Sequence, residues 1–599
     1  MLRETRTTPR LVSGMEAAAA ILCARFGTDE PSVCVASGLL DFQRDAVVRA
    51  RSILARRGGV LIADSVGLGK THVALELLRP AFDARAHITI VGPATLERHW
   101  RSAARDRGEF EWASYARLGR GSVPPGQRDF VVFDEAHALR NPGTHRHRAA
   151  HTLARGASVV LLSATPVNNS LWDLYHLLRL FAGDRAFADV GVPSLRAAFE
   201  DACTTCLLGS TAAIQPVLRA VLVRRTRSVL GQGIDRDAGV AGLSFPRQED
   251  PVPIYYAMGR AGEPGLLEPV GAALLELDFP VHRYAGTAPV ELLRRSLLKR
   301  LESSVHAFAR SVGSYDALLR SCARAAENGM LVRPRDRVSI DDEQLGFDSL
   351  LYEPIPSGDA TRVLRGAIDR ELERVARMLG ALAGAPDTKL AALERLLDGS
   401  LRGRRVIVFT QFRDTARYLH DRLSRRFRCA LIDGAGAMLG KAVAERASVV
   451  RRFAPMANEA RPPAAAETID VLVATDVLSE GFNLQDASAV VSYDLPWNPI
   501  RLVQRIGRVD RLGSPHASVS SFHFLPGDLD RYLGLVERLA AKTSAIEASI
   551  GSDVPALHAD IVRALDRRDA GELARLESEH GAFAFDERLR ALARRLPPP

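Results

Sequence analysis

Long apolar runs are missing from this sequence of 599 residues, and both cysteine and lysine are scarce. No apolar run approaches the roughly 18 to 20 residues that a membrane-spanning helix needs. The six cysteines are scattered, which favours a reduced chain over a disulfide framework. Cys203 and Cys206 have the spacing of a metal-binding pair, but no second pair of Cys or His residues follows at a suitable distance. We therefore expect no membrane segment and no zinc site.

Lysine is rare although the chain is basic, with a formal net charge of +9 and 80 basic residues. Only five of these are lysines, and the others are arginines. The lysines are Lys70, Lys299, Lys389, Lys441 and Lys542. Together with the many alanines, this indicates a codon bias. A position that tolerated either base would hold arginine against this background, so the lysine at position 70 is informative. The modest net charge permits a polyanionic partner without demanding one.

What is present is the composition of an ordinary globular protein, with 47% hydrophobic and 25% charged residues. The length predicts about two to four domains with substantial cores. The first residues are Arg-rich and lead into the apolar segment Ala17–Ala24. We interpret this segment as a first helix, because its apolar core is too short for a typical export signal.

Two regions alternate short, β-branched apolar runs with helical patterns, which is typical of buried parallel strands with crossover helices. In residues 36–240 the runs are GVLIAD, HITIVGP, DFVVFDE and SVVLLSAT, and in residues 396–530 they are RVIVFTQF, IDVLVATD, AVVSYDLP and VSSFHFL. The runs end in polar or small residues, at the strand ends where parallel sheets bind ligands. We therefore expect an α/β protein with two parallel sheets in tandem.

The rest of the chain falls into segments of other character. Residues 231–250 have the composition of a Gly/Asp-rich linker, and residues 250–395 have a mostly helical pattern that predicts an inserted module. We expect a helical segment over 1–35, a helical tail over 531–599 and a surface loop over 455–468.

Residues 64–71, DSVGLGKT, resemble a phosphate-binding loop of the Walker type but carry Asp64 in place of the first glycine. A strand, a glycine turn and a helix that begins near Lys70 would aim backbone N–H groups at an anion. Lys70 would then contact the β- and γ-phosphates, and the Thr71 hydroxyl would bind Mg²⁺. The alternative interpretation is a glycine-rich turn without a ligand.

A second candidate element is the pair Asp134 and Glu135, which ends the predicted strand DFVVFDE. A carboxylate at this edge suits Mg²⁺, and its neighbour can polarise an attacking water as a general base. Such a pair alone is usually just solvated, but here it lies in the same predicted sheet as Lys70.

The later motifs are individually less specific. Ser163 and Thr165 end another predicted strand, where hydroxyls can sense a γ-phosphate. In PWNPIRLVQRIGRVDRLGS, a helix would place three of Gln504, Arg505, Arg508 and Arg511 on one side. Such arginines can act as fingers on ATP bound to the other sheet, or they can form a solvated basic helix.

Nine motifs in order resemble those of a superfamily-two DNA translocase of the SWI/SNF type, nearer to its bacterial RapA/HepA-like branch. They are FQRDAV, ADSVGLGKT, VGPATLERHW, FDEAH, SATPVNNSLWDLYHLL, VRRTR, VFTQF, TDVLSEGFNLQ and QRIGRVDRLG. The string LLKRLESSVHAFARS (297–311) also resembles the helical segment of that branch. The resemblance covers about residues 36–530 and implies two RecA-like lobes, each a parallel sheet with helices on both faces, joined by a mostly helical insertion.

The resemblance also implies roles for individual residues. Catalytic roles are implied for Lys70, Asp134, Glu135, Arg508 and Arg511. ATP-binding roles are implied for Gln43, Asp64, Gly67, Leu68, Gly69, Lys70 and Thr71, with Thr71 and Asp134 holding Mg²⁺. Roles in coupling the lobes are implied for His137, Ser163, Thr165, Gly481 and Gln504.

Nucleic-acid contacts are implied for Thr95, Arg140, Asn141, Gln411 and Asn483. Because backbone contacts carry no sequence information, we expect weak sequence specificity and strong salt dependence. Trp497 can stack on a base or belong to the core. We interpret the row His145, His147 and His151 and the run DRLSRRFR (421–428) as exposed polar faces, with a phosphate-contacting patch as the alternative for the run.

The sequence therefore predicts an enzyme that hydrolyses ATP with Mg²⁺ and moves along double-stranded DNA to remodel or displace bound protein. We expect it in the bacterial cytoplasm, associated with the nucleoid, with other proteins of a DNA-repair or phage-defence system as partners. One alternative is a strand-separating DNA or RNA helicase. Another is a nucleotide-gated adaptor that binds nucleic acid without productive turnover.

Overall fold

The computed structural model describes most of the chain between residues 39 and 526. The described residues are 39–65, 67–123, 128–167, 170–205, 212–225, 245–256, 267–285, 290–328, 330–334, 352–356, 360–383, 385–479 and 482–526. The predicted segments 1–35 and 531–599, and Gly481, lie outside these residues. Among the described residues, none of the helices is both long enough and apolar enough to cross a bilayer.

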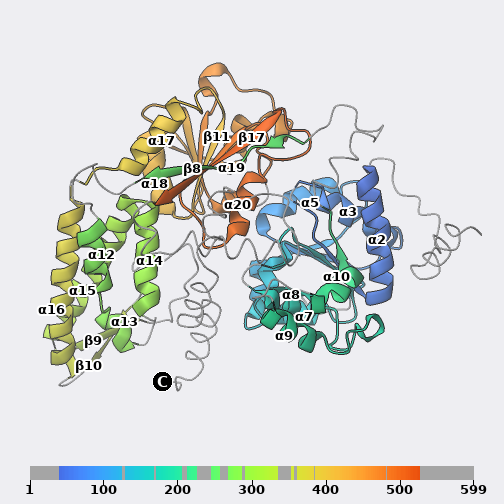
Figure 1. Ribbon diagram of the computed structural model, residues 1–599, viewed down its shortest axis with the longest axis horizontal. Coiled ribbons are helices and arrows are strands. Elements are labelled where there is room, and N and C mark those ends of the chain that lie inside the picture. Colours follow the sequence, from blue (N-terminus) through green and yellow to red (C-terminus); the bar gives the residue numbers. More distant parts are fainter. Residues whose placement is uncertain are drawn as a thin grey trace, which may run out of the picture.

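The first lobe is built on a six-stranded parallel sheet with the order β3-β2-β4-β5-β1-β6 (Figure 1). Its strands are β1 (Gly59–Ile62), β2 (Ile88–Gly92), β3 (Glu111–Ser114), β4 (Phe130–Asp134), β5 (Ser158–Leu162) and β6 (Leu222–Val223). The sequence predicted β1, β2, β4 and β5. It missed the edge strands β3 and β6, because one is polar and the other has only two residues.

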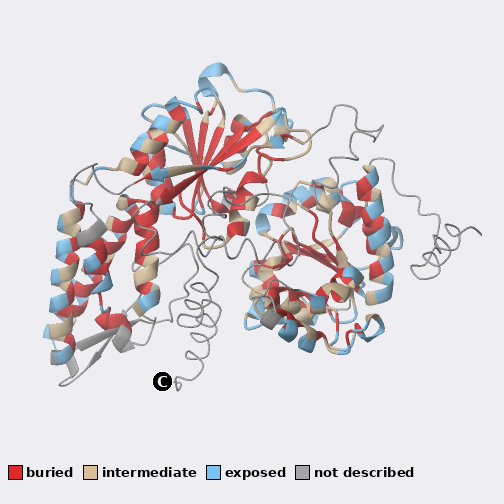
Figure 2. Ribbon diagram, in the orientation of Figure 1, coloured by how far each residue is buried: buried red, intermediate tan, exposed pale blue. Residues whose placement is uncertain are grey.

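Helices cover both faces of this sheet and form two separate hydrophobic cores. They are α2 (Asp41–Arg57), α3 (Lys70–Leu77), α4 (Arg79–Asp83), α5 (Glu97–Ala103), α6 (Tyr115–Gly119), α7 (His145–Leu153), α8 (Leu171–Leu178), α9 (Leu195–Thr205) and α10 (Gln215–Val221). Along β1, Leu61 packs into one core while Val60 and Ile62 pack into the other, as side-chain alternation requires. The strands β1 and β2 are therefore buried throughout, and β5 is buried after its first residue (Figure 2).

The second lobe contains a nine-stranded mixed sheet with the order β14-β13-β12-β15-β11-β16-β17-β7, in which β8 also pairs with β17. Its strands are β7 (Arg247–Gln248), β8 (Val252–Tyr256), β11 (Val406–Thr410), β12 (Cys429–Ile432), β13 (Ala437–Leu439), β14 (Ala442–Ala444), β15 (Val471–Thr475), β16 (Ala489–Ser492) and β17 (Ser518–Pro526). The helices α18 (Arg413–Leu423), α19 (Arg446–Phe453) and α20 (Pro499–Ile506) accompany it. The fold class predicted from the sequence, two α/β lobes with a mostly helical insertion between them, is confirmed, but β13 and β14 pair antiparallel at one edge of the second sheet.

One predicted boundary is wrong. Residues 247–256 were expected to be linker and the beginning of the insertion, but β7 and β8 extend the second sheet parallel to β17. The Gly/Asp-rich composition had indicated a linker up to residue 250, and Pro253 lies within β8 itself. Within the described residues β8 lies at the sheet edge, where a strand tolerates a residue that has no N–H to donate.

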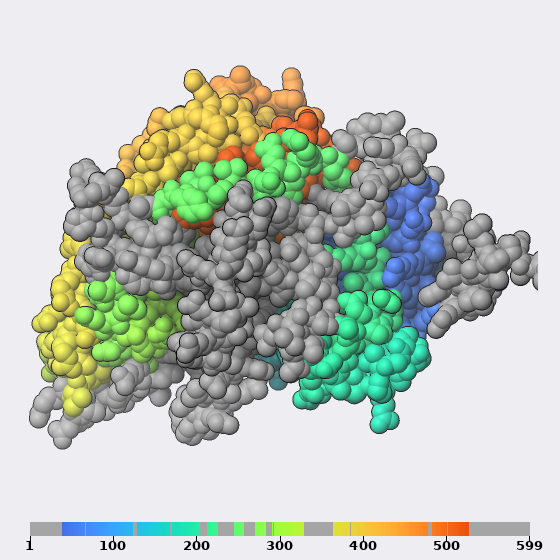
Figure 3. Space-filling view, in the orientation of Figure 1, coloured from blue at the N-terminus to red at the C-terminus, as the bar shows by residue number. Residues whose placement is uncertain are grey.

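The insertion is an arm of helices that extends away from the first lobe (Figures 1 and 3). It contains α12 (Leu267–Leu275), α13 (Pro280–Ala285), α14 (Val290–Ser303), α15 (Val305–Glu327) and α16 (Ala360–Leu382). An antiparallel pair, β9 (Met330–Pro334) and β10 (Tyr352–Pro356), belongs to the same arm. The helix α17 (Thr388–Asp398) leads from the arm into the second lobe.

Candidate active site

The loop between β1 and α3 has the turn geometry that its glycines predicted. Gly67 and Gly69 have φ angles of 86° and 80°, which glycine adopts without strain. A Cβ atom on Gly69 would lie 2.6 Å from Nε2 of Gln43, so a larger residue there would displace the Gln43 side chain and strain the backbone. Lys70 begins α3, and its Nζ donates to the carbonyl oxygens of Asp64 at 3.0 Å and Ser65 at 3.4 Å. The ammonium group therefore lies directly across the loop.

Gln43 holds this loop from α2. Its Nε2 donates to the carbonyl oxygen of Leu68 at 3.0 Å, and its Oε1 accepts from the backbone N–H of Leu40 at 3.1 Å. The buried side chain thus joins the start of α2 to the loop.

Asp64, for which the resemblance implied a role in ATP binding, is held inside the first lobe. Its carboxylate is fully buried, and Oδ1 accepts hydrogen bonds from the backbone N–H and Nε of Arg225, each at 3.0 Å. Arg225 also pairs with Oδ2 of Asp64 and donates to the carbonyl oxygen of Phe42. Since a buried charge needs a partner, Asp64 anchors the loop to the residues after β6 instead of facing a ligand. The role of Arg225, in the string VRRTR, was not predicted.

Asp134 lies at the end of β4 with both carboxylate oxygens engaged. Its Oδ2 accepts from the indole Nε1 of Trp100 at 2.8 Å, and Oδ1 accepts from the backbone N–H of Glu135 at 2.9 Å. Burial and the neighbouring Glu135 raise the pKa of Asp134 to about 6. Trp100 is fully buried on α5, and its hydrogen bond was missed because an apolar position on a helix carries no sign of its polar partner.

The backbone of Glu135 adopts the left-handed conformation, with a φ angle of 50° that is strained for a residue with a side chain. Although burial acts in the opposite direction, contact with His137, together with the charges of Lys70 and Arg508, lowers the pKa of Glu135. Nδ1 of His137 lies 3.3 Å from Oε2 of Glu135. Glu135 is therefore ionised at neutral pH, as a general base must be.

The arginines after α20 do not share one helix face, because the helix ends at Ile506. Arg508 and Arg511 lie in the following turns, whereas Arg505 is fully buried and pairs with Asp476 at 2.7 Å. That part of the prediction is wrong, and Arg505 supports the interior of the second lobe.

Arg508 reaches the first lobe electrostatically. Burial is the largest cause of the lowered pKa of Lys70, and the charge of Arg508 acts in the same direction. The charge of Arg508 also lowers the pKa of Glu135. Arg511 is directed elsewhere: its Nη1 donates to Oδ1 of Asn483, and its charge lowers the pKa of His99, for which burial is the larger cause.

The predicted coupling residues of the first lobe lie next to this site. Ser163 and Thr165 are buried just after β5, which pairs with β4. Oγ of Ser163 accepts from the backbone N–H of Thr165 at 3.3 Å. Gln504 is buried on α20 of the second lobe.

The predicted nucleic-acid contacts follow strands in both lobes. Thr95 is exposed on a short turn after β2, and Nη1 of Arg140 donates to the carbonyl oxygen of His137 at 3.3 Å. Oδ1 of Asn141 accepts from the backbone N–H of Gly143 at 3.0 Å, so this side chain shapes its own turn. Gln411 is only 4% exposed, and its backbone N–H donates to the carboxylate of Asp494.

The features interpreted as structural behave in that way. Trp497 is half-buried against the core of the second lobe and the insertion. Three arginines of the run 421–428 pair with carboxylates: Arg425 with Asp421, Arg426 with Asp398, and Arg428 with Asp470. His147 is an exception to the expected exposed face: it is only 7% exposed, and its Nδ1 is bonded to the carbonyl oxygen of Leu139. In the part of the chain that the structure describes, no cluster of three His, Cys, Asp or Glu residues suits a metal ion.

Two family models match the chain in the order of its two lobes. A SNF2-related domain matches residues 115–237, and a helicase conserved C-terminal domain matches residues 388–513. The two lobes therefore carry the domains of a helicase-related ATPase of the SWI/SNF type. The first match lies in the lobe that carries Asp134 and Glu135, and the second in the lobe that carries Arg508.

Curated relatives agree with this assignment. The SWI/SNF-type ATPase is 24% identical to the ATP-dependent helicase YqhH of Bacillus subtilis over 480 residues, which cover 76% of the chain and 70% of YqhH. It is 25% identical to the RNA polymerase-associated protein RapA of Vibrio campbellii over 496 residues, 76% of the chain and 44% of RapA. The chain thus spans less than half the length of RapA.

A solved structure of the same type is also similar. The SWI2/SNF2 ATPase core of Sulfolobus solfataricus, determined in complex with dsDNA, is 16% identical, with a TM-score of 0.31, and the match covers 87% of the chain and 94% of that core.

Proposed function

We propose that this ATPase moves along double-stranded DNA and uses the movement to remodel or displace bound protein. The proposal is supported by the charge of Arg508, which comes from the second lobe and contributes to lowering the pKa values of Lys70 and Glu135 in the first. Groups that bind and hydrolyse a nucleotide are thus divided between two bodies. Hydrolysis between two such lobes changes their spacing, which is what a motor needs.

Each group has a chemical role in this proposal. Lys70 binds the β- and γ-phosphates, and Arg508 stabilises the charge that develops on the transferred phosphoryl group. Glu135 orients the attacking water and accepts its proton. His137 holds Glu135 from the side at 3.3 Å.

Thr71 and Asp134 supply the hydroxyl and carboxylate oxygens that Mg²⁺ prefers. The donor set fits this ion, because Trp100 and the backbone N–H of Glu135 fix the Asp134 carboxylate at the end of β4. When bound, Mg²⁺ neutralises phosphate charge. Asp134 must then be ionised, and a cation beside it would lower the pKa that burial raises.

Nucleic-acid contacts on both lobes would convert lobe movement into movement along a strand. Thr95, Arg140 and Asn141 follow strands of the first lobe, and Asn483 follows β15 of the second. Phosphate contacts from these segments would be independent of sequence and sensitive to salt.

A strand-separating helicase is the second candidate, favoured by the name of YqhH. A nucleotide-gated adaptor without turnover is disfavoured, because Lys70, Glu135 and Arg508 are all present and a switch would not need all three. As a bacterial protein of the nucleoid, the ATPase would act with other proteins of a DNA-repair or phage-defence system.

The test is ATP turnover with duplex DNA, single-stranded DNA, RNA or no nucleic acid. We expect duplex DNA to stimulate turnover most, and Lys70→Ala and Glu135→Gln to abolish it. Lys441→Ala is the matched control, because Lys441 is exposed between β13 and β14. Stimulation by RNA alone would contradict the duplex motor, and turnover of the wild type no higher than that of both variants would contradict any motor.

A further inference from the structure

The junction of α14 and α15 in the insertion is polar but buried. Its six consecutive residues, KRLESS, include two cations, one anion and two hydroxyls, and they form the segment Lys299–Ser304. None of the six is more than 6% exposed. Charges in such a place need partners, and this junction finds many of them in the second lobe.

Glu302 is the centre of the charged part. Its Oε2 accepts from Nζ of Lys299 at 2.7 Å, and Nζ of Lys389, on α17, lies 3.9 Å from its Oε1. The same Oε1 accepts from the backbone N–H of Leu495 in the second lobe at 3.2 Å, and Lys299 donates to the carbonyl oxygen of Leu495. Lys299 therefore joins the arm to the segment after β16, and Lys389 joins the arm to α17.

Ser303 extends the contact to Asp494, the residue before Leu495. Its Oγ donates to Oδ2 of Asp494 at 2.7 Å and lies 2.8 Å from Oγ1 of Thr415. Thr410, at the end of β11, donates to the same Asp494 oxygen. The backbone N–H of Gln411 donates to Oδ1 of Asp494 at 2.9 Å. The arm thus completes the set of donors around one fully buried carboxylate.

Asp494 is connected to Arg508 through Arg505. Its backbone carbonyl accepts from Nη1 of Arg505 at 2.9 Å, and Arg505 forms a two-point ion pair with Asp476 at 2.7 and 3.1 Å. The backbone N–H of Arg508 donates to the carbonyl oxygen of Arg505 at 3.2 Å. An unbroken path of hydrogen bonds and short chain segments therefore runs from Ser303 to Arg508.

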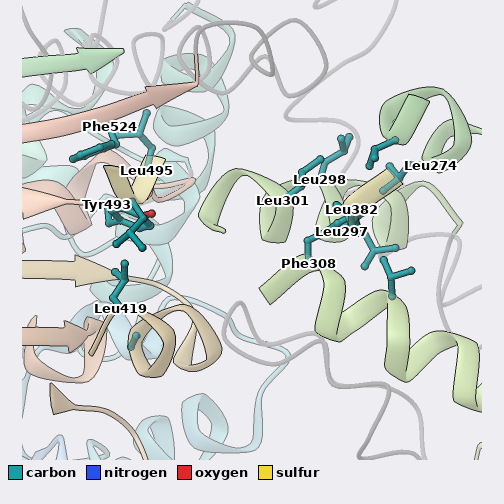
Figure 4. Close-up of a cluster of buried hydrophobic side chains, with 14 of the residues drawn as sticks. Leu274, Leu297, Leu298, Leu301, Phe308, Leu382, Leu419, Tyr493, Leu495 and Phe524 are labelled. Atoms are coloured by element: carbon teal, nitrogen blue, oxygen red, sulfur yellow. The ribbon is translucent and has the colours of Figure 1, made fainter. Parts of the chain in front are cut away.

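The hydrophobic packing follows the same path. Figure 4 shows Leu297, Leu298 and Leu301 of α14 in one buried cluster with residues of the second lobe. The cluster members that it labels from the second lobe are Leu419, Tyr493, Leu495 and Phe524. The polar contacts are thus embedded in a core shared by the arm and the lobe, where water does not compete for them.

We propose that Ser303 is a positioning residue of the ATPase: through Asp494 and Arg505, it fixes where Arg508 meets the bound nucleotide. The arm then helps the second lobe to position its catalytic arginine. This inference rests on the role proposed above for Arg508.

The test is Ser303→Ala, measured as ATP turnover without nucleic acid. We expect kcat to fall about tenfold, because a displaced catalytic group loses rate steeply, while the KM for ATP stays unchanged. Ser311→Ala is the matched control: Ser311 is a buried serine on α15 whose Oγ bonds Arg300 and the carbonyl oxygen of Ala307, and no described hydrogen bond links it to Asp494. We expect Ser311→Ala to keep the wild-type kcat. Equal kcat values for the two variants would overturn the proposal.

A double-mutant cycle separates positioning from simple loss of stability. In an Arg508→Ala background, Ser303→Ala should cause no further loss of kcat, because the group it positions is gone. The same tenfold loss in both backgrounds would overturn the proposal. Wild-type turnover by Arg508→Ala itself would instead contradict the proposed function, so the two failures are distinguishable.

Discussion

At the scale of single residues, the candidate site depends on neighbouring side chains that fix its residues by hydrogen bonds. Gln43 holds the phosphate loop, Arg225 holds Asp64, and Trp100 holds Asp134. The sequence indicated the candidate site residues themselves because short motifs place them at fixed spacings. Two of the supporting partners lie 34 and 161 residues away in the chain, and no local pattern records such pairs.

Trp100 provides a direct prediction for the cation. Trp100→Phe keeps the ring in the core but removes the N–H that fixes Oδ2 of Asp134. We expect the affinity of the nucleotide site for Mg²⁺ to fall by about 1.5–3 kcal/mol, the usual contribution of a hydrogen bond to a charged group. A magnesium titration of the binding of a fluorescent ATP analogue measures it.

Trp112→Phe is the control for this prediction. Trp112 is also a buried indole of the first lobe, and its Nε1 has no hydrogen-bond partner among the described residues. The two variants differ only in whether an indole contacts Asp134. Equal Mg²⁺ titrations for both would show that Trp100 contributes packing alone.

At the scale of elements, the sequence predicted central strands better than edges. Central strands such as β4 and β15 are apolar on both faces, which produces a run that is easy to read. The edge strand β8 contains Pro253 and is partly exposed, so its pattern is that of a loop. The helical periodicity of the sequence predicted the insertion. Its attachment to the second lobe through KRLESS could not be predicted, because Ser303 and Asp494 lie 191 residues apart.

His282 makes the stability of the insertion sensitive to acid. It is 1% exposed on α13, with its ring beside those of Phe279 and Tyr315, and burial lowers its pKa to about 4. The unfolded chain, with a histidine pKa of about 6.5, therefore binds the proton first as the pH falls. The stability contributed by neutral His282 is complete above pH 6.5 and is lost towards pH 4, by up to about 3 kcal/mol.

Urea unfolding of the wild type and of His282→Gln between pH 7 and pH 4.5 measures this contribution. We expect the variant to lose less stability over this range than the wild type. His145→Gln, which changes an exposed histidine, should retain the slope of the wild type. Identical slopes for His282→Gln and the wild type would exclude His282 as a source of the acid sensitivity.

At the scale of the whole molecule, the candidate catalytic groups are divided between the two lobes. The first lobe carries the phosphate loop and the acids, while the second carries Arg508 and shares a hydrophobic core with the arm. The sequence motifs predicted this division because each lobe has its own set. They could not predict that the arm and the second lobe share a core, because that depends on contacts between distant helices and strands.

The central claim is that ATP hydrolysis drives movement along a duplex whose strands stay paired. The most direct measurement is displacement of a third strand from triplex DNA, with the two duplex strands followed separately. We predict displacement of the third strand that requires ATP and is lost in Glu135→Gln, while the duplex remains intact. Separation of the duplex strands, or full ATP turnover on duplex DNA without displacement of the third strand, would contradict the account.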